Sequence, residues 1–478
     1  MPKSKLKNTI ESSLPFDLND GQNELANKLV DFILYKPQRT IFILRGYAGT
    51  GKSSLTGALV KSLPVINMKS CLLAPTGRAA KVLSKYSNKE ALTIHKRIYF
   101  KKTNSLGYSF FDRAPSLFKN TIFFVDEASM IADEGGNGKG AFGNLNLLDD
   151  LINYVYSGEG CKLIFIGDTA QLPPVGSAFS PALSKDYLEY NFKFDVMEHE
   201  LTQVVRQDED SGVLFNATYL RNSLRSKSYP KLNDSFNDVK RINGYELQDE
   251  LENAFSNYDN NDVKVICRSN KRSNIFNQQI RNRIFWHEEE ISSGDLLMVV
   301  KNNYYWLEES SKIGFIANGD IVKVIKVLKY HEIYNLRFVD IIAELPDYPK
   351  EPEIEVRVLL DSIETEQASM PRDKMKEFYY SVLDDYSDER NKGKRVKKVL
   401  NDPFFNALQV KFAYSVTCHK SQGGQWPIVF VDQGYLTEEM LDESFFRWLY
   451  TAITRATEKV FLVNFNKEFF LEKTTSYD

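Results

Sequence analysis

Residues 46–53 read GYAGTGKS, and this stretch decides the fold of the first half of the chain. It fits G-x-x-x-x-G-K-[ST], a pattern whose glycines let backbone N–H groups close around phosphate oxygens. The run before it, TIFILRG at 40–46, is apolar and β-branched, which is typical of a buried strand. The run after it, SSLTGALVKSL, has helical spacing, which places the phosphates at a helix N-terminus. A strand, a glycine-rich loop and a helix in this order predict a nucleotide site.

Two side chains of this loop carry chemistry. Lys52 is placed to reach the β and γ phosphates of a nucleotide, and the Ser53 hydroxyl is placed to ligate Mg²⁺. We therefore expect ATP and Mg²⁺ as ligands. The loop residues expected to contact ATP are Gly46, Tyr47, Ala48, Gly49, Thr50, Gly51, Lys52, Ser53 and Ser54.

Two further apolar runs end in polar residues that suit the same site. TIFFVDEAS at 121–129 ends in Asp126, placed to hold Mg²⁺ directly or through water, and Glu127, placed to polarise the attacking water. KLIFIGD at 162–168 leads into a loop that carries Gln171. Strands separated by helices predict a parallel α/β sheet with ligands at the carboxyl ends of the strands. Gln171 then lies near the γ-phosphate, although taken alone it is as easily an ordinary loop residue.

Bulk composition is that of an ordinary folded protein with more than one domain. Of the 478 residues, 42% are hydrophobic and 26% are charged, and the net charge is −3. That charge neither excludes nor supports a nucleic-acid partner, because a motor can concentrate positive charge in one groove. Four distant cysteines without a CxxC motif favour a reducing compartment over a disulfide framework or a zinc knuckle. With no signal-peptide pattern and no membrane-length apolar run, we expect a soluble, cytoplasmic protein without a membrane partner.

The second half repeats the strand and helix pattern without a second phosphate loop. Apolar strands are expected at 263–270, 407–417, 427–432 and 459–465, and a helical run at 448–458 carries Arg455. A second core without its own nucleotide site suggests one ATP held between two cores, at 1–200 and 201–478. An arginine that reaches across stabilises transition-state charge on the γ-phosphate.

Two inserts interrupt this pattern. Residues 291–405 contain strands opened by Gly-Asp turns, which suggest a small β-barrel, followed by a charged helical segment at 364–398. That segment is either a solvated helical hairpin or an arm that contacts phosphates or a partner. Residues 97–120 read as a β-hairpin around NSLG, with aromatic rings at Tyr99, Phe100, Tyr108, Phe110 and Phe111.

The motifs, taken in order, resemble the RecD/Dda-type DNA helicases of superfamily 1 (1B). The resemblance rests on LNDGQ, GYAGTGKS, APTGRAA, LTIHK, FFVDEAS, GDTAQLPPVG, LTQVVRQ and YTAITRATE, and it covers about 18–470. It implies two RecA-like P-loop NTPase cores, an SH3-like barrel in the second, and a hairpin in the first that splits the duplex. It also implies a monomeric motor that moves 5′→3′ on single-stranded DNA and acts at duplex junctions.

The resemblance also assigns residues around ATP. It implies that Gln22 contacts adenine and that Arg206 and Arg455 contact the γ-phosphate. Val205 stands where many relatives carry an aromatic that stacks on the base. The residues expected to act in hydrolysis are Lys52, Asp126, Glu127, Gln171, Arg206 and Arg455.

A single strand needs backbone contacts from both cores. The first core is expected to supply the strand–helix junction Pro75, Thr76, Gly77 and Arg78, together with Thr93 and His95. The second core is expected to supply Asn270, Thr417, His419 and Lys420.

The stretch CHKSQGGQW at 418–426 admits several readings. A cysteine–histidine nucleophile pair lacks an orienting third group, and a metal site lacks a ligand cluster. The stretch resembles helicase motif V, which implies that Gly424 and the residue after it face the nucleotide. Many relatives carry Glu at that next place, where it bonds the ribose; Gln425 can bond a hydroxyl only without charge.

Two other functions compete with the helicase. A small-molecule phosphotransferase uses the same phosphate loop, but such enzymes are usually one core with a lid. A non-catalytic nucleic-acid-binding module can keep the helicase shape, but it has no need of an intact Lys52, Asp126, Glu127, Gln171 and Arg455 set. The expected function is therefore ATP-dependent unwinding of DNA.

Overall fold

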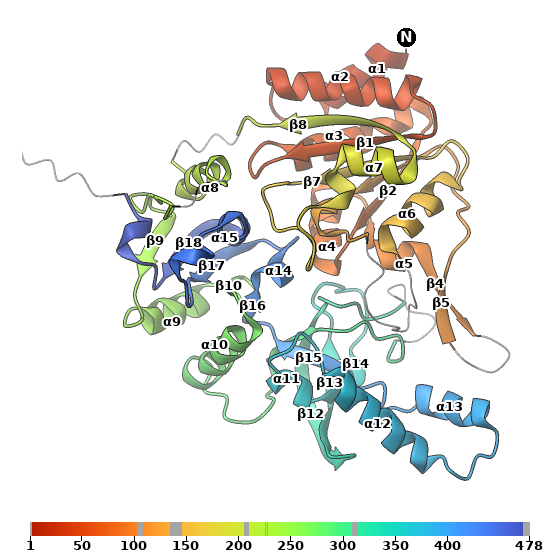
Figure 1. Ribbon diagram of the computed structural model, residues 1–478, viewed down its shortest axis with the longest axis vertical. Coiled ribbons are helices and arrows are strands. Elements are labelled where there is room, and N and C mark those ends of the chain that lie inside the picture. Colours follow the sequence, from red (N-terminus) through yellow and green to blue (C-terminus); the bar gives the residue numbers. More distant parts are fainter. Residues whose placement is uncertain are drawn as a thin grey trace, which may run out of the picture.

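The computed structural model describes residues 2–103, 109–133, 146–204, 210–224, 226, 228–307 and 314–471. For residues 101–103 and 109–111 it describes the backbone alone. Figure 1 shows two α/β bodies, with the N-terminal body at one end and a smaller barrel and its helices at the other.

The first α/β body is built on a parallel sheet in the order β3-β2-β6-β7-β1-β8. Its strands are buried almost throughout, as is expected when helices cover both faces of a parallel sheet. Strand β7 lies between β1, which leads into GYAGTGKS, and β6, which ends at Asp126. The bounds are β1 (Thr40–Gly46), β2 (Lys69–Ala74), β3 (Ala91–Thr93), β6 (Thr121–Val125), β7 (Lys162–Gly167) and β8 (Asp195–Leu201).

Helices cover the two faces of this sheet with separate apolar cores. One core joins the first four helices to the sheet, and the other joins the next three to its opposite face. The first set is α1 (Pro2–Ser12), α2 (Asp20–Tyr35), α3 (Lys52–Ser62) and α4 (Gly77–Ser87). The second set is α5 (Ile94–Ile98), α6 (Leu147–Tyr156) and α7 (Lys185–Phe192). Short 3₁₀ turns lie at Leu63–Ile66, Ala128–Met130, Pro181–Leu183, Glu438–Met440 and Lys467–Phe469.

The second α/β body has a parallel sheet in the order β16-β10-β17-β18-β9. One face packs on α9 and α10, and the other packs on α8 and α15. The strands are β9 (Val239–Ile242), β10 (Val263–Cys267), β16 (Ser415–Thr417), β17 (Trp426–Asp432) and β18 (Ala456–Val463). The helices are α8 (Gly212–Asn222), α9 (Leu247–Asn257), α10 (Asn270–Arg283), α14 (Cys418–Ser421) and α15 (Glu443–Ile453). The expected fold class, two RecA-like cores with parallel sheets, is confirmed.

A closed barrel of five strands grows out of the second core and shares an apolar core with it. Its strands are β11 (Leu296–Val299), β12 (Ile321–Ile333), β13 (Leu336–Glu344), β14 (Ile354–Leu359) and β15 (Leu408–Phe412). The helical part of the insert is α11 (Asp361–Glu364), α12 (Arg372–Asp385) and α13 (Lys392–Leu400). This agrees with the barrel and helices expected in the second half.

Two sequence predictions are wrong in this half. The stretch 407–417 is not one core strand, because β15 closes the barrel and only β16 pairs with β10. The barrel therefore extends beyond the predicted end at 405. The helix predicted at 448–458 ends at Ile453, and strand β18 begins at Ala456. Arg455 therefore lies in the turn between α15 and β18.

The hairpin is present as β4 (Tyr99–Thr103) and β5 (Ser109–Arg113), an antiparallel pair projecting from the first core (Figure 1). Tyr99 is buried and its hydroxyl donates to Asp150 of α6 at 2.9 Å, so this ring anchors the hairpin base. Phe100 is 41% exposed. The rings of Tyr108, Phe110 and Phe111 lie outside the described residues.

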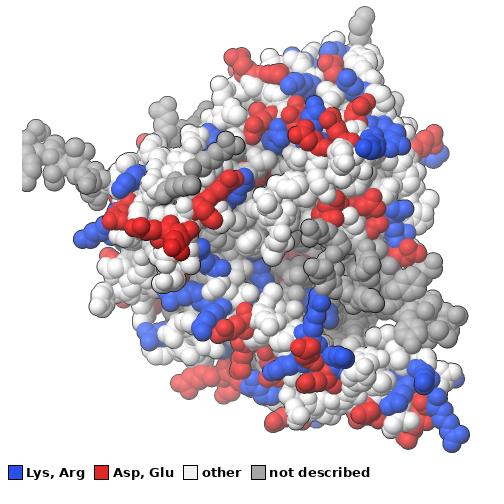
Figure 2. All heavy atoms as spheres, viewed as in Figure 1, with Lys and Arg blue, Asp and Glu red and all other residues white. Residues whose placement is uncertain are grey.

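Acidic and basic side chains are interspersed over the face seen in Figure 2, without one dominant charged field. Within the described part of the chain, no helix is long and apolar enough to cross a membrane.

Candidate nucleotide site and nucleic-acid surface

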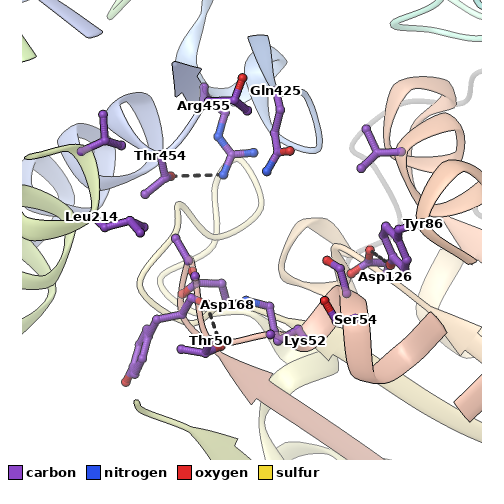
Figure 3. Close-up of a pocket in the computed structure, with 18 of the residues that line it drawn as sticks. Thr50, Lys52, Ser54, Tyr86, Asp126, Asp168, Leu214, Gln425, Thr454 and Arg455 are labelled. Carbon is purple, nitrogen blue, oxygen red and sulfur yellow. Dashed lines mark hydrogen bonds between the residues drawn. The ribbon is translucent and has the colours of Figure 1, made fainter. Parts of the chain in front are cut away.

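A cavity of about 1080 Å³ lies between the two cores. It collects most of the predicted ATP and catalytic residues, and they approach it from both sides (Figure 3). The first core contributes Tyr47, Ala48, Gly49, Thr50, Gly51, Lys52, Ser53, Ser54, Asp126, Glu127 and Gln171, and the second core contributes Gln425 and Arg455.

The phosphate loop has the backbone geometry that an anion needs. Gly51 is the N-cap of α3 with φ 87°, a conformation that favours glycine, and no side-chain hydrogen bond caps this helix among the described residues. The first-turn amides are therefore open to phosphate oxygens, and the helix dipole adds to the attraction. Gly46 does not line the cavity, but a Cβ there would lie 2.9 Å from Thr50 Oγ1 and 3.1 Å from Leu201 Cβ. Its role is close packing of the loop.

Lys52 folds back onto its own loop. Its Nζ donates to the carbonyl oxygens of Gly46 at 2.5 Å and Tyr47 at 2.8 Å. These two carbonyl oxygens hold the ammonium group at the mouth of the loop. A bound phosphate can replace them as hydrogen-bond acceptor, because a charged acceptor forms the stronger hydrogen bond.

Asp126 and Glu127 stand side by side at the end of β6 in a place shielded from water. Burial raises the pKa of Asp126, although Tyr86 donates a hydrogen bond to its Oδ2 at 2.6 Å. Burial also raises the pKa of Glu127 to about 7, against the opposing effect of Arg455. A carboxylate poised near neutrality suits a group that handles a water proton.

Unpaired oxygens mark where further ligands fit. Glu127 Oε2 and Gln171 Oε1 are buried without a hydrogen-bond partner among the described residues, and both side chains line the cavity. A buried acceptor without a donor is costly unless a water or ligand satisfies it. Both oxygens are therefore suited to bind the attacking water.

The donor set also fits Mg²⁺. No cluster of three or more His, Cys, Asp or Glu that could hold a metal is found in the described ranges. Mg²⁺ usually needs only one or two protein oxygens beside substrate phosphates and waters. Asp126 and Ser53, which line the same cavity, supply a carboxylate and a hydroxyl.

Arg455 reaches the cavity from the second core. Only 4% of its surface is exposed, and its guanidinium donates to Thr451 O at 3.0 Å, Gly424 O at 3.1 Å and Thr454 Oγ1 at 3.2 Å. Figure 3 shows Arg455 and Gln425 on one side of the cavity, with Lys52, Ser54 and Asp126 across from them. Gly424 does not line the cavity: its carbonyl orients Arg455, and a Cβ would lie 2.4 Å from the Trp426 ring.

Gln22, another predicted ATP contact, does not line the cavity. Gln22 is fully buried outside the cavity lining, where its Nε2 donates to Thr50 O at 3.2 Å and its Oε1 accepts from Asn19 N–H at 3.2 Å. Both ends of its amide already have partners in the capping box of α2 and the phosphate loop, so it supports the loop from behind. Arg206 and Val205 lie outside the described residues.

Sequence reasoning missed several cavity residues. Tyr86, Asp168, Leu214 and Gly423 line it, as do Pro15, Phe16 and Asp17 before α2. Asp168 had a detectable signal, because it ends strand β7 beside the two strands that carry the predicted site. Tyr86 had none, since nothing in a helical KVLSKYS run distinguishes a tyrosine that will bond to Asp126.

On the first core, most of the predicted DNA contacts already have protein partners. Thr76 and Thr93 cap α4 and α5 through hydrogen bonds to Ala79 N–H and Lys96 N–H, each 3.2 Å long. Arg78 donates to Gln425 O at 3.2 Å and lies 4.9 Å from the Trp426 ring, so it joins the two cores.

Two more of these residues, Pro75 and Gly77, lie at the α4 N-terminus, and a third, His95, lies in α5. Gly77 is buried against the barrel, where a Cβ would lie 2.2 Å from Asp320 Oδ1. Pro75 is partly exposed just before α4. His95 lies 5.7 Å from the Tyr99 ring, and burial lowers its pKa to about 4, which leaves it neutral.

On the second core, the predicted DNA contacts lie at helix N-termini beside the sheet. Asn270 begins α10, Thr417 precedes α14, and His419 and Lys420 lie within α14. His419 is exposed, and burial lowers the pKa of Lys420 to about 8. The next turn touches the first core, since a Cβ at Gly423 would lie 2.7 Å from Ala79 Cβ. The two proposed DNA-binding loops are therefore in direct contact.

The cysteine beside them is not a nucleophile. Cys418 is buried, and burial raises the pKa of its thiol to about 12. Its thiol donates to Trp448 O at 3.4 Å, so the residue is part of the second core's packing.

One phosphate loop facing an arginine of a second α/β core defines a two-core P-loop ATPase. Residues 17–227 match the family model described as AAA domain, and 412–463 match the UvrD-like helicase C-terminal domain. The chain is 28% identical over 325 residues to the ATP-dependent DNA helicase dda of Enterobacteria phage T4, covering 65% of this chain and 68% of that protein. It is 26% identical over 514 residues to the uncharacterized protein R530 of Acanthamoeba polyphaga mimivirus, covering 92% and 99%.

A crystal structure of Pif1 helicase from Bacteroides in complex with ADP-AlF3 and ssDNA is also similar. Its TM-score is 0.48 at 15% identity, over 95% of each chain. The family and sequence matches, together with the ordered motifs, support a superfamily 1B helicase.

Proposed function

We propose that this protein is an ATP-dependent DNA helicase that moves 5′→3′ along single-stranded DNA and separates strands at duplex junctions. One observation carries the proposal: a single cavity holds the phosphate loop and carboxylates of one core opposite Arg455 and Gln425 of the other. A nucleotide between two bodies couples its own turnover to their relative movement.

The residues divide the chemistry as follows. The loop amides and Lys52 bind the phosphates. Ser53 and Asp126 would hold Mg²⁺, which would supply neutralisation of the developing charge. Glu127 takes up the proton of the attacking water while Gln171 orients that water. Arg455 stabilises the γ-phosphate charge from the second core. When that charge leaves with the product, the attraction between the cores weakens and the cleft opens.

The DNA track in this proposal crosses both cores. Lys420, Asn270 and His419 offer side chains near the exposed surface of the second core, and the α4 N-terminus offers backbone amides on the first. The hairpin β4–β5 supplies the element that separates the strands. The resemblance to RecD/Dda-type helicases supports the direction and a monomeric working state. A DNA substrate supports an intracellular location in this proposal.

The test compares ATP hydrolysis with and without single-stranded DNA, and unwinding of duplexes that carry either a 5′ or a 3′ tail. We expect strong stimulation by DNA and unwinding of the 5′-tailed duplex alone. Lys52→Ala should abolish both activities, because the γ-phosphate loses its cation.

Other results of these assays would contradict separate parts of the proposed function. Unwinding of the 3′-tailed duplex alone would contradict the direction and leave the helicase intact. Phosphate transfer to a small acceptor, indifferent to DNA, would contradict the helicase and favour a phosphotransferase. Normal unwinding by Lys52→Ala would contradict the nucleotide site.

A further inference from the structure

Tyr450 of the second core reaches into the first core's nucleotide site. It lies on α15, only 1% of its surface is exposed, and its hydroxyl makes two hydrogen bonds across the cleft. The Ala48 N–H of the phosphate loop donates to it at 3.0 Å, and it donates to Asp168 Oδ2 at 2.5 Å. Ala48 and Asp168 both line the ATP cavity. No motif expectation assigned a role to this tyrosine.

The same helix holds the loop that carries Gln171. Arg447 donates to the carbonyl oxygens of Thr169 and Gln171, and Thr451 Oγ1 accepts from Leu172 N–H at 3.0 Å. Arg447, Tyr450 and Thr451 are spaced by three and four residues, so they share one face of α15. That face of α15 therefore contacts both the loop that follows β7 and the phosphate loop.

Arg455 follows on the same stretch of chain, two residues after α15 ends. The distance from Arg455 to the phosphates of a bound ATP therefore depends on the position of α15. On that face of α15, Tyr450 is the side chain that forms a hydrogen bond with the phosphate loop itself. Catalytic geometry is sensitive to misplacements of about 1 Å. The hydroxyl also stays protonated, because burial and the neighbouring Asp168 carboxylate raise the pKa of Tyr450 well above its usual value.

We propose that Tyr450 is a positioning residue for ATP hydrolysis. Its hydroxyl ties the phosphate loop to Asp168 and so sets the place from which Arg455 meets the γ-phosphate. The inference rests on the proposed ATPase function, and it concerns the chemical step and not the affinity for nucleotide. In the described structure the Tyr450 hydroxyl bonds to the Ala48 amide of the loop and not to the phosphate-binding amides of the α3 first turn.

The decisive variant is Tyr450→Phe, which keeps the ring and removes both hydrogen bonds. We expect kcat for DNA-stimulated hydrolysis to fall roughly 10- to 100-fold, the range for loss of a hydrogen bond to a charged group. KM for ATP and the Kd for ADP should stay within about threefold of wild type. Such a split between kcat and KM is the signature of positioning.

Tyr414→Phe is a matched control. Tyr414 is also fully buried, and its hydroxyl also accepts from a backbone N–H, that of Leu296 at 3.2 Å, and donates to a carboxylate, Asp295 Oδ1 at 3.1 Å. It stands between the barrel and the second core, away from the ATP cavity. We expect this variant to lose thermal stability like Tyr450→Phe and to keep wild-type kcat per folded molecule.

Asp168→Asn tests the same inference independently, and it can be used if Tyr450→Phe folds poorly. We expect a similar fall in kcat, and the double variant should fall no further than about threefold below the lower single one, because both changes break one unit. If the wild type is active and Tyr450→Phe leaves kcat unaltered, the inference is overturned and the proposed function stands. The same holds if the effects of the two changes on kcat multiply. A wild type without ATPase activity would overturn the proposed function and the inference with it.

Discussion

At the scale of single residues, the environment of Glu127 indicates its chemical role most clearly. Its backbone is left-handed with φ 51°, an uncommon conformation for a residue with a side chain, and its Oε2 has no partner in the described structure. Burial raises its pKa to about 7, whereas the unfolded chain titrates near 4.5. The folded protein therefore keeps this proton to a higher pH than the unfolded chain does.

That shift predicts a pH dependence. If Glu127 must be ionised to take up the proton of water, kcat/KM for ATP should rise with pH through a midpoint near 7. Glu127→Gln should abolish hydrolysis and leave ADP binding in place. Stability changes in the opposite sense: ionising the buried carboxyl between pH 4.5 and 7 costs wild-type stability, so Glu127→Gln should raise the melting temperature at pH 8 and not at pH 4.5. Equal shifts at both pH values would contradict the burial argument.

Residues that carry the site were predictable where chemistry and position coincide in the sequence. Asp126 and Glu127 directly follow strand β6, and Lys52 begins the helix after the loop that follows β1, so the strand pattern places all three at the edge where ligands bind. Gln22 and Thr93 show the limit of that reasoning: their polar groups are taken by the phosphate loop and a helix cap. A sequence names a polar side chain, but only packing decides which partner it finds.

At the scale of elements, apolar periodicity predicted the two sheets and failed where neighbouring strands serve different bodies. ALQVKFAYSVT is apolar throughout, so nothing in its pattern marks the change from barrel strand β15 to core strand β16. The end of α15 was missed for a related reason. TRATE has acceptable helix propensity, but β18 pairs with β17 from Ala456 onward, and that pairing overrides the local preference.

The hairpin β4–β5 gives a prediction at this scale. Asp150 of α6 accepts from the Tyr99 hydroxyl at 2.9 Å and pairs with Arg113 at 3.6 Å, so one carboxylate anchors both strands. Asp150→Ala should lower the unwinding rate several-fold, because a loose hairpin no longer holds its place against the duplex. DNA-stimulated ATPase activity should stay within about twofold, since the cavity is elsewhere.

Asp149→Ala is the control for this change. It removes the adjacent carboxylate of the same helix turn and leaves the Asp150 contacts with Tyr99 and Arg113 in place. Unwinding should match wild type. Equal losses of unwinding in both variants would point to α6 and not to the hairpin, and parallel loss of ATPase activity would show damage to the first core.

At the scale of the whole molecule, the three bodies meet at the N-terminus of α4. Arg78 joins the first core to Gln425 and Trp426 of the second, and Lys81 pairs with Asp347 of the barrel at 2.7 Å. The barrel also places Asp320 against Gly77, where its Oδ1 accepts from the Tyr348 hydroxyl at 3.2 Å. No single segment predicts this junction, because it joins positions more than 200 residues apart.

The carboxylate of Asp320 therefore stands where a DNA phosphate is expected, at the positive end of the α4 dipole. Removing its charge should favour the phosphate. Asp320→Asn should raise the affinity for single-stranded DNA about two- to fivefold at pH 7.5, the range that one charge at a helix terminus supplies.

The pH dependence of this effect follows from the surroundings of Asp320. Burial raises its pKa to about 6, while Lys96, which faces it with Tyr348 and Asp347, opposes that rise. Wild type should therefore gain affinity as the pH falls through 6, when the carboxyl becomes neutral, and the variant should not. Asp340→Asn, which removes a barrel carboxylate bonded to Arg357, controls for loosening of the barrel. A gain in both variants, or a gain in Asp320→Asn that persists undiminished at pH 5, would mean that barrel mobility and not charge governs access of DNA to α4.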